Sequence, residues 1–138
     1  MASNSSNKKS LMHDRRRCLH IATLALLAAF APLAAATPSE QEHKLIMALI
    51  AHVQGMTTMK FLRNGEPHDA GEAAEHMQAK YKHFRDEIVT AEDFIERCAS
   101  RSELTGKPYM VKLADGKTHE ARGFLTQELR AMRQQGRR

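Results

Sequence analysis

The dipeptide Asn64-Gly65 is the feature that most limits how this chain can fold. Both residues tolerate a positive φ, which a tight β-turn requires at its centre. The strand-forming pair Phe61-Leu62 precedes the turn, and residues 66–68 follow it as a short return strand. Pro67 restricts that return strand to a sheet edge, because proline lacks the N–H that a second neighbouring strand would need. We therefore expect an antiparallel hairpin around this turn.

A second hairpin is expected nearer the C-terminus. In residues 109–113, Tyr109, Val111 and Leu113 alternate with Met110 and Lys112, which is the period of a half-buried strand. Asp115-Gly116 is a turn signal of the same kind as Asn64-Gly65. Residues 117–120 then form the return strand, and a turn at residues 106–108 precedes the whole unit.

Four helices surround these hairpins in the predicted order. Ser39, Asp69 and Thr90 each precede an acidic residue by three positions, which is the pattern of a capping box at a helix start. The first helix should stop at Gly55, and a last amphipathic helix should cover residues 122–134. The third helix is short and is expected to fray at residues 100–102. The fold class is therefore α+β: a small single domain with about four helices packed on short antiparallel hairpins.

The first 36 residues have the pattern of an export signal. Basic residues at 8–9 and 15–17 precede an apolar run at residues 19–33, and Ala34-Ala35-Ala36 resembles a peptidase cleavage site. Cleavage before Thr37 would leave a single domain at 37–138 in the periplasm. A retained membrane anchor is the alternative, although the run is shorter than the roughly 20 apolar residues of a spanning helix. The general secretory route is favoured over the twin-arginine route.

Removal of the signal changes the charge of the protein. The whole chain has a net charge of +5, but residues 37–138 contain 16 basic and 15 acidic side chains. A net charge of +1 does not favour nucleic-acid binding. We expect no membrane contact after cleavage and a monomer or weak dimer.

Cys98 is the cysteine that remains after cleavage. An odd cysteine in an oxidising compartment is buried, pairs between chains, or is reactive. Phe94, Ile95 and Cys98 share a helical face, so burial is the preferred interpretation. We expect the thiol to be inert.

No complete catalytic or cofactor motif is present in the sequence. Glu72, His76 and His83 have a spacing that a metal could use on one helix face, but solvated side chains are the preferred interpretation. Gly106-Lys107 fails as a phosphate loop, because Pro108 stands where serine or threonine is required. No cofactor is expected. A hydrolase that uses two carboxylates as acid and base remains an alternative, because such pairs come together only in the folded chain.

Polar residues near the turns are the candidate site. Arg63, Lys80, Arg101 and Lys107 could converge on an anion, with ordinary surface charge as the alternative. The candidate polar cluster, for binding or for structure, is Arg63, Asn64, His76, Lys80, Lys107 and Tyr109.

Arg63 is expected to be a structural clamp. It shares a strand face with Phe61, so its charge must reach the sheet edge or find an acidic partner. Glu72, Glu92 and Asp93, which lie at helix starts, are the candidate partners. Ligand binding by Arg63 is the alternative.

Taken in order, these motifs resemble the YfeK-like family of small exported bacterial proteins. The motifs that carry the resemblance are Phe61-Leu62-Arg63-Asn64-Gly65, His68, Glu72-Ala73, His76-Met77, Lys80, Thr90-Ala91-Glu92, Phe94-Ile95, Ala99-Ser100, Ser102 and Thr105-Gly106-Lys107-Pro108-Tyr109. The family is one of unknown function, so the resemblance implies an exported compact domain and supplies no catalytic residues.

Two functions remain open from the sequence. The first is a periplasmic binding or protein-interaction module, whose partner would be another envelope protein or a small anionic ligand. The second is a small envelope enzyme, such as a hydrolase, with a site assembled from polar turn residues.

Overall fold

The computed structural model describes residues 36–138, so the predicted signal peptide lies almost wholly outside the described residues. The elements are α1 (Glu40–Gln54), β1 (Lys60–Arg63), β2 (Glu66–His68), α2 (Ala70–Phe84), the 3₁₀ turn η1 (Arg85–Glu87), α3 (Ala91–Cys98), β3 (Met110–Lys112), β4 (Thr118–Glu120) and α4 (Ala121–Gln135). The described chain is a small α+β domain, as predicted. No helix among these residues has the length and apolar character needed to cross a membrane.

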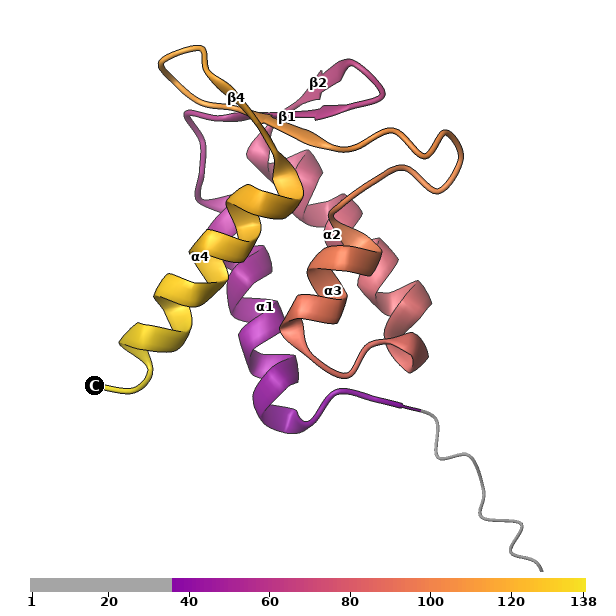
Figure 1. Cartoon of the computed structure of the whole chain (residues 1–138), viewed down its shortest axis with the longest axis vertical. Coiled ribbons are helices and arrows are strands. Elements are labelled where there is room, and N and C mark those ends of the chain that lie inside the picture. Colours follow the sequence, from indigo (N-terminus) through magenta and orange to yellow (C-terminus); the bar gives the residue numbers. More distant parts are fainter. Residues whose placement is uncertain (1–35) are drawn as a thin grey trace, which may run out of the picture. The chain divides into compact units, whose positions relative to one another are not determined.

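The two predicted hairpins join into one antiparallel sheet with the strand order β2-β1-β3-β4. The join is the pairing of β1 with β3, in which Phe61 lies opposite Val111. β2 is an edge strand, as Pro67 requires. The sheet lies at one end of the helices, and α1 and α4 run between that end and the opposite one (Figure 1).

The core lies between the helices and the inner face of the sheet. Phe61 and Val111 extend from the sheet into it, because alternate strand residues face the same side. The largest fully buried side chains are Phe94, Ile46, Leu49, Ile88, Ile95, Leu125, Leu129, Val53, Val111 and Cys98. These residues come from α1, α3, α4, β3 and the segment before α3, and α2 adds the buried side chains of Met77 and Tyr81. The described residues therefore have a core of their own.

The predicted helix caps are mostly confirmed. Asp69 and Thr90 each form both hydrogen bonds of a capping box. Ser39 accepts the N–H of Glu42, but the second half of that box is absent. The Glu42 carboxylate instead accepts the N–H of Ala91 at 2.7 Å, so it connects the start of α1 to the start of α3.

The turns are also as expected, with one correction. Asn64 and Gly65 have φ values of 53° and 85°. The stretch after α3 does not fray. Ser100 is buried and donates its hydroxyl to the carbonyl of Ile95 at 2.8 Å, and the Ser102 N–H donates to the carbonyl of Lys107 at 3.0 Å. These hydrogen bonds satisfy polar groups that a frayed helix end would leave to water.

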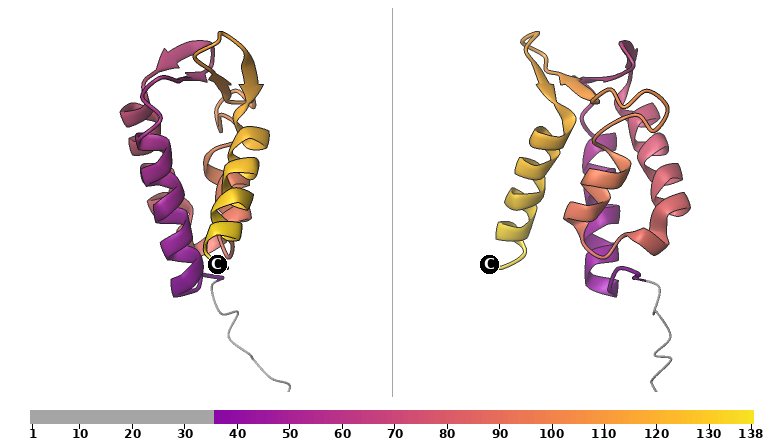
Figure 2. Two further views of the ribbon diagram at one scale, coloured as in Figure 1. Left: turned by 90° about the vertical axis from the view of Figure 1, so that its left-hand side faces the viewer. Right: turned by 45° about the vertical axis from the view of Figure 1, so that its right-hand side comes forward.

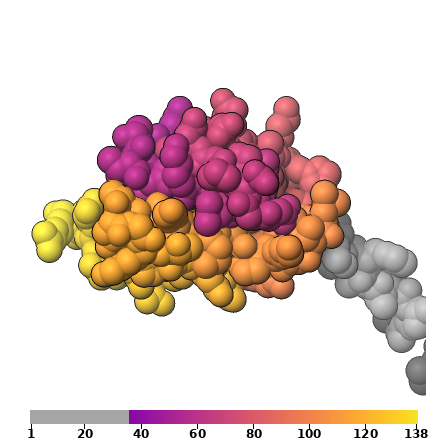
Figure 3. Space-filling view, turned by 90° about the horizontal axis from the view of Figure 1, so that it is seen from above, coloured from indigo at the N-terminus to yellow at the C-terminus, as the bar shows by residue number. Residues whose placement is uncertain are grey.

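The two ends of the described domain lie together. Glu42 in the first turn of α1 binds Arg133 near the end of α4, with a distance of 3.0 Å between Oε1 and Nη1. Both views in Figure 2 show the start of α1 and the end of α4 at the pole away from the sheet. Viewed from the sheet end, β1, β2 and the chain from α3 to β4 form the surface (Figure 3).

Candidate functional site

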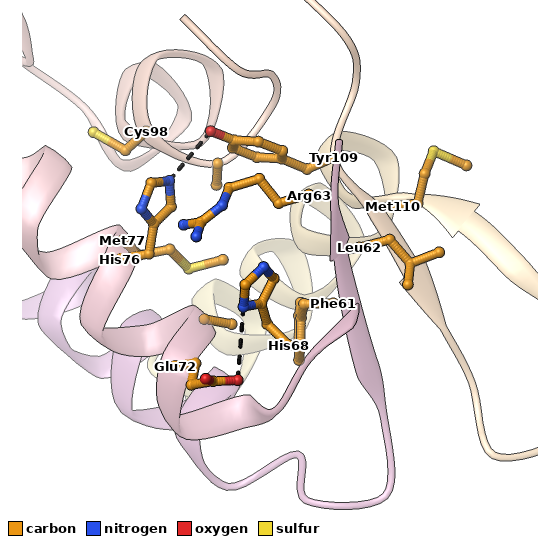
Figure 4. Close-up of a pocket in the computed structure, with 12 residues that line it drawn as sticks. Phe61, Leu62, Arg63, His68, Glu72, His76, Met77, Cys98, Tyr109 and Met110 are labelled. Atoms are coloured by element: carbon orange, nitrogen blue, oxygen red, sulfur yellow. Dashed lines mark hydrogen bonds and ion pairs between the residues drawn. The ribbon is translucent and has the colours of Figure 1, made fainter. Parts of the chain in front are cut away.

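A small pocket lies between α2 and the inner face of the sheet (Figure 4). Its cavity volume is about 30 Å³, which is room for a few water-sized atoms. The lining residues are Phe61, Leu62, Arg63, His68, Glu72, Ala73, His76, Met77, Cys98, Ala99, Tyr109 and Met110. Several of these are apolar, among them Ala73, Met77 and Ala99.

Arg63 supplies a cation to this pocket. Strand β1 ends at Arg63, and the alternation that buries Phe61 turns Arg63 to the same inner side of the sheet. The side chain is half-buried and points toward His76 and Tyr109 in Figure 4. Among residues 36–138, no hydrogen bond or ion pair to the Arg63 guanidinium is present.

The other two half-buried arginines that bridge elements are satisfied. Arg97 binds the carboxylates of Glu87 and Glu103 at 2.9 and 3.2 Å. Arg133 binds those of Glu42 and Glu92 at 3.0 and 2.7 Å. Within the described part of the chain, Arg63 therefore differs from them in lacking an anionic partner.

The prediction that Arg63 clamps the hairpin to a helix start is wrong. Glu72 completes the α2 capping box and lies 3.6 Å from the His68 ring. Asp93 completes the α3 capping box, and Glu92 binds Arg133. All three predicted carboxylate partners are engaged elsewhere, Glu72 and Asp93 by local helix capping and Glu92 by Arg133.

His76 and Tyr109 meet at the inner end of the pocket. His76 Nε2 lies 3.2 Å from the Tyr109 hydroxyl, and the two rings pack edge to face. Burial is the main reason that the pKa of His76 falls from 6.5 to about 4. The charges of Arg63, Lys80 and His68 lower it further. His76 is therefore a neutral imidazole at physiological pH, in a pocket with positive potential.

Lys80 does not line the pocket but contacts Tyr109, which does. Its side chain is buried, and its Nζ donates to the carbonyl of Arg101 at 3.3 Å and lies 3.6 Å from the Glu103 carboxylate. The same ammonium lies 5.5 Å from the centre of the Tyr109 ring, within range of a cation–π interaction. Lys80 thus orients Tyr109 and has its own partners.

The structure brings together only part of the predicted cluster. Arg63, His76 and Tyr109 line the pocket, and Lys80 touches Tyr109. Asn64 instead accepts the Thr105 hydroxyl at 2.6 Å outside the pocket, and Lys107 is exposed.

The predicted anion site of Arg63, Lys80, Arg101 and Lys107 does not form, because these side chains do not converge. Arg101 pairs with Glu96 at 2.9 Å, and Lys80 pairs with Glu103. Neither Arg101 nor Lys107 lines the pocket at Arg63. His68 and Glu72 do line it, because the end of β2 leads directly through the Asp69 cap into the first turn of α2.

The candidate metal ligands do not converge. His76 binds Tyr109, whereas His83 is exposed and packs on the ring of Phe84. Over the part of the chain that the structure describes, no group of three or more His, Cys, Asp or Glu side chains is placed to hold a metal ion.

Cys98 lines the pocket but is fully buried, as predicted. Burial raises the pKa of its thiol from 9.0 to about 12. Burial also raises the pKa of Tyr109 above its usual value. Neither group is a thiolate or phenolate near neutral pH. Apart from the Glu72 carboxylate, which accepts the Asp69 N–H, the pocket therefore offers the Arg63 cation and neutral hydrogen-bonding groups.

Comparison with known proteins identifies relatives of this chain. The model of a family of unknown function, DUF5329, matches residues 40–133. An uncharacterized protein, YfeK of Salmonella typhimurium, is 37% identical over 92 residues, which cover 67% of this chain and 72% of that protein. No solved structure matches the chain. The match confirms the resemblance seen in the sequence motifs, and the chain belongs to the DUF5329 family.

Proposed function

We propose that this protein is an exported periplasmic interaction module that takes one carboxylate of an envelope partner into the pocket at Arg63. The observation that carries the proposal is the half-buried Arg63 guanidinium, which forms no ion pair with a carboxylate among residues 36–138, not even with Glu66 opposite it on β2. A guanidinium binds a carboxylate through two parallel hydrogen bonds, so this geometry favours a carboxylate over a neutral group. The N-terminal export pattern supports the periplasmic location.

The size of the pocket favours a protein partner. Pockets that enclose a whole small molecule have volumes of roughly 300–1,000 Å³. A volume of about 30 Å³ fits a single functional group. The rest of the bound molecule must then lie outside the pocket, as it would when an acidic side chain or a chain terminus of another protein inserts.

The electrostatics of the pocket support an anion. Arg63 is among the charges that hold the pKa of His76 low. A bound carboxylate would neutralise Arg63 and thereby raise the pKa of His76. The imidazole is therefore a reporter for anion binding that lies inside the site.

The test is an NMR titration of residues 37–138 with acetate, with His76 ring signals as the readout. We expect acetate to shift the signals of His76 and Tyr109 and to raise the pKa of His76 above about 4. Arg63→Ala should abolish both effects and leave the melting temperature nearly unchanged, since Arg63 has no partner to lose within the described domain.

Arg130→Ala is the matched control, because Arg130 is exposed on α4 and outside the pocket. It should titrate like the unmodified domain. If acetate leaves His76 and Tyr109 unchanged in the unmodified domain, or if Arg63→Ala binds acetate equally well, the proposal is wrong.

A further inference from the structure

Leu104 is the most exposed large apolar side chain among the described residues. Its relative exposure is 95%, and the other exposed large apolar residue, Val89, reaches 45%. Leu104 belongs to the loop of residues 102–107, which we call the Leu104 loop. This loop lies between the end of α3 and the start of β3. Single exposed apolar residues are ordinary on flexible loops, so the question is whether this loop is held in place.

Internal hydrogen bonds close the Leu104 loop on itself. The Ser102 N–H donates to the carbonyl of Lys107 at 3.0 Å, and the Gly106 N–H donates to the carbonyl of Ser102 at 2.9 Å. Ser102 is buried at the base of the loop, and its hydroxyl oxygen accepts the Thr105 N–H at 3.4 Å. Gly106 has a φ of 69°, which permits the sharp turn. Leu104 is therefore presented to solvent on a fixed support.

One further hydrogen bond joins this loop to the mouth of the pocket. The Thr105 hydroxyl donates to Asn64 Oδ1 at 2.6 Å, so a neighbour of Leu104 binds a neighbour of Arg63. The hydrogen bond spans 41 positions of sequence and connects the loop to the β1–β2 turn. The hydrogen bond between Thr105 and Asn64 thus connects the segment that carries Leu104 to the segment that carries Arg63.

The charges around this contact are unequal. Glu103, the acidic residue of the loop, is neutralised by Arg97 at 3.2 Å and by Lys80 at 3.6 Å. Lys107 and Arg63 have no ion-pair partner among residues 36–138. The surface around this contact therefore combines one apolar side chain with two cations and one acid, Glu66, that form no ion pair among residues 36–138, which leaves an excess of positive charge.

We propose that the Leu104 loop is the second contact of the partner that the Arg63 pocket binds, with Leu104 entering an apolar pocket on an acidic protein. This inference rests on the proposed function. The cations complement carboxylates at the rim of the partner's pocket, and a fixed loop loses little conformational entropy on binding. A bilayer is a poorer match, because a single leucine without neighbouring aromatic residues inserts little apolar surface.

The experiment uses the full chain, produced in the organism it comes from with the photoreactive side chain of p-benzoylphenylalanine at one position. Leu104→p-benzoylphenylalanine should crosslink to a protein on irradiation. The same substitution at Lys117, which is exposed at the β3–β4 turn, is the control and should not give that adduct. Adding Arg63→Ala should reduce the Leu104 adduct at least fivefold.

The crosslinked protein is then purified and its affinity measured against three forms of the domain. Relative to the unmodified form, Leu104→Ser should weaken binding about tenfold or more, and Leu104→Met should restore most of it. Both variants should keep the melting temperature, since the side chain is 95% exposed. This result, with an acidic partner, supports the inference.

Other outcomes overturn it. The inference is wrong if position 104 gives no protein adduct, or if the adduct is with phospholipid or with a second copy of the chain. It is also wrong if position 117 gives the same adduct in equal yield, or if Arg63→Ala does not reduce the yield of the Leu104 adduct. The acetate titration separates the two proposals. Acetate binding without the Leu104 adduct refutes only the role of the loop, whereas loss of acetate binding refutes the proposed function itself.

Discussion

At Gly65 the constraint is conformational, because no atom lies within 4 Å of the place a Cβ would occupy. The residue has a φ of 85°, which L-residues with a branched side chain rarely adopt. We expect Gly65→Val to destabilise the domain by about 1–3 kcal/mol through backbone strain. Urea unfolding would measure the change.

Gly123→Ala is the control for that prediction. Gly123 lies inside α4, also has open space, and has no positive φ. Alanine there should stabilise the domain by up to about 1 kcal/mol, because it favours the helix. Equal effects of the two substitutions would contradict the assignment of strain to Gly65.

Cys98 is a second residue whose environment predicts its chemistry. The thiol has no exposed area, and burial raises its pKa to about 12. Alkylation by iodoacetamide at pH 8 should therefore be slow in the folded domain and should accelerate in step with unfolding in urea. Rapid labelling without denaturant would show that the α3 face opens to solvent.

Residues with local signals were predictable and those with distant partners were not. The positive φ of Asn64 and Gly65 follows from residue type alone. The position of Arg63 on the inner face followed from the two-residue period of a strand. Its lack of a partner depends on which groups the carboxylates of Glu72 and Asp93 bind in the folded chain. No pattern in the sequence reports that competition.

At the scale of elements, Arg133 connects three helices. It lies on α4 and binds Glu42 of α1 and Glu92 of α3, while Glu42 also caps Ala91. We expect Arg133→Met to destabilise the domain by roughly 2 kcal/mol, a typical value for hydrogen bonds to charged groups. The measurement is the urea midpoint. Arg130→Met, on the exposed side of the same helix, should change it little; a similar loss in both variants would indicate a general effect on α4.

The helices themselves were predicted from capping residues and apolar spacing, and their bounds agree closely with the structure. The contact between Glu42 and Arg133 spans 91 positions, and no local pattern indicates it. The capping-box pattern at Ser39 even assigned Glu42 to a different hydrogen bond. Local signals define elements well because they act within a few residues, whereas side chains near element ends choose among partners that only folding brings close.

For the whole molecule, His76, Glu42 and Asp93 make stability depend on pH below neutrality. The pKa of His76 is about 4 in the folded state against 6.5 for the unperturbed ring. The unfolded chain therefore binds this proton first as the pH falls, and stability is lost between about pH 6.5 and 4. Glu42 and Asp93 have pKa values below their usual 4.5 and 3.8, so their contributions persist above those values and are lost at lower pH.

We accordingly expect the melting temperature to fall from pH 7 to pH 4 and to fall again at lower pH. In His76→Gln the loss between pH 6.5 and 4 should be smaller, and the loss below pH 4 should persist. Calorimetry at a series of pH values would measure both. An unchanged slope between pH 6.5 and 4 in His76→Gln would show that another group accounts for it.

The fold class was predictable as a whole, and the assembly of its sheet was not. Each hairpin follows from its own Asn-Gly or Asp-Gly turn. The pairing of Phe61 with Val111, which makes one sheet from two hairpins, joins residues 50 positions apart. Such pairing is selected by the shared core and not by either strand alone.

The meeting of α1 and α4 at Arg133 has a consequence for connectivity. Because Glu42 and Arg133 touch, a short linker from the end of α4 to the start of α1 would close the domain into a ring. The ring could then be opened at the exposed Asp115-Gly116 turn, at the pole that carries the sheet. Such a circular permutant would keep the core contacts and place both new termini at the sheet pole, beyond the start of β1 and not at its Arg63 end.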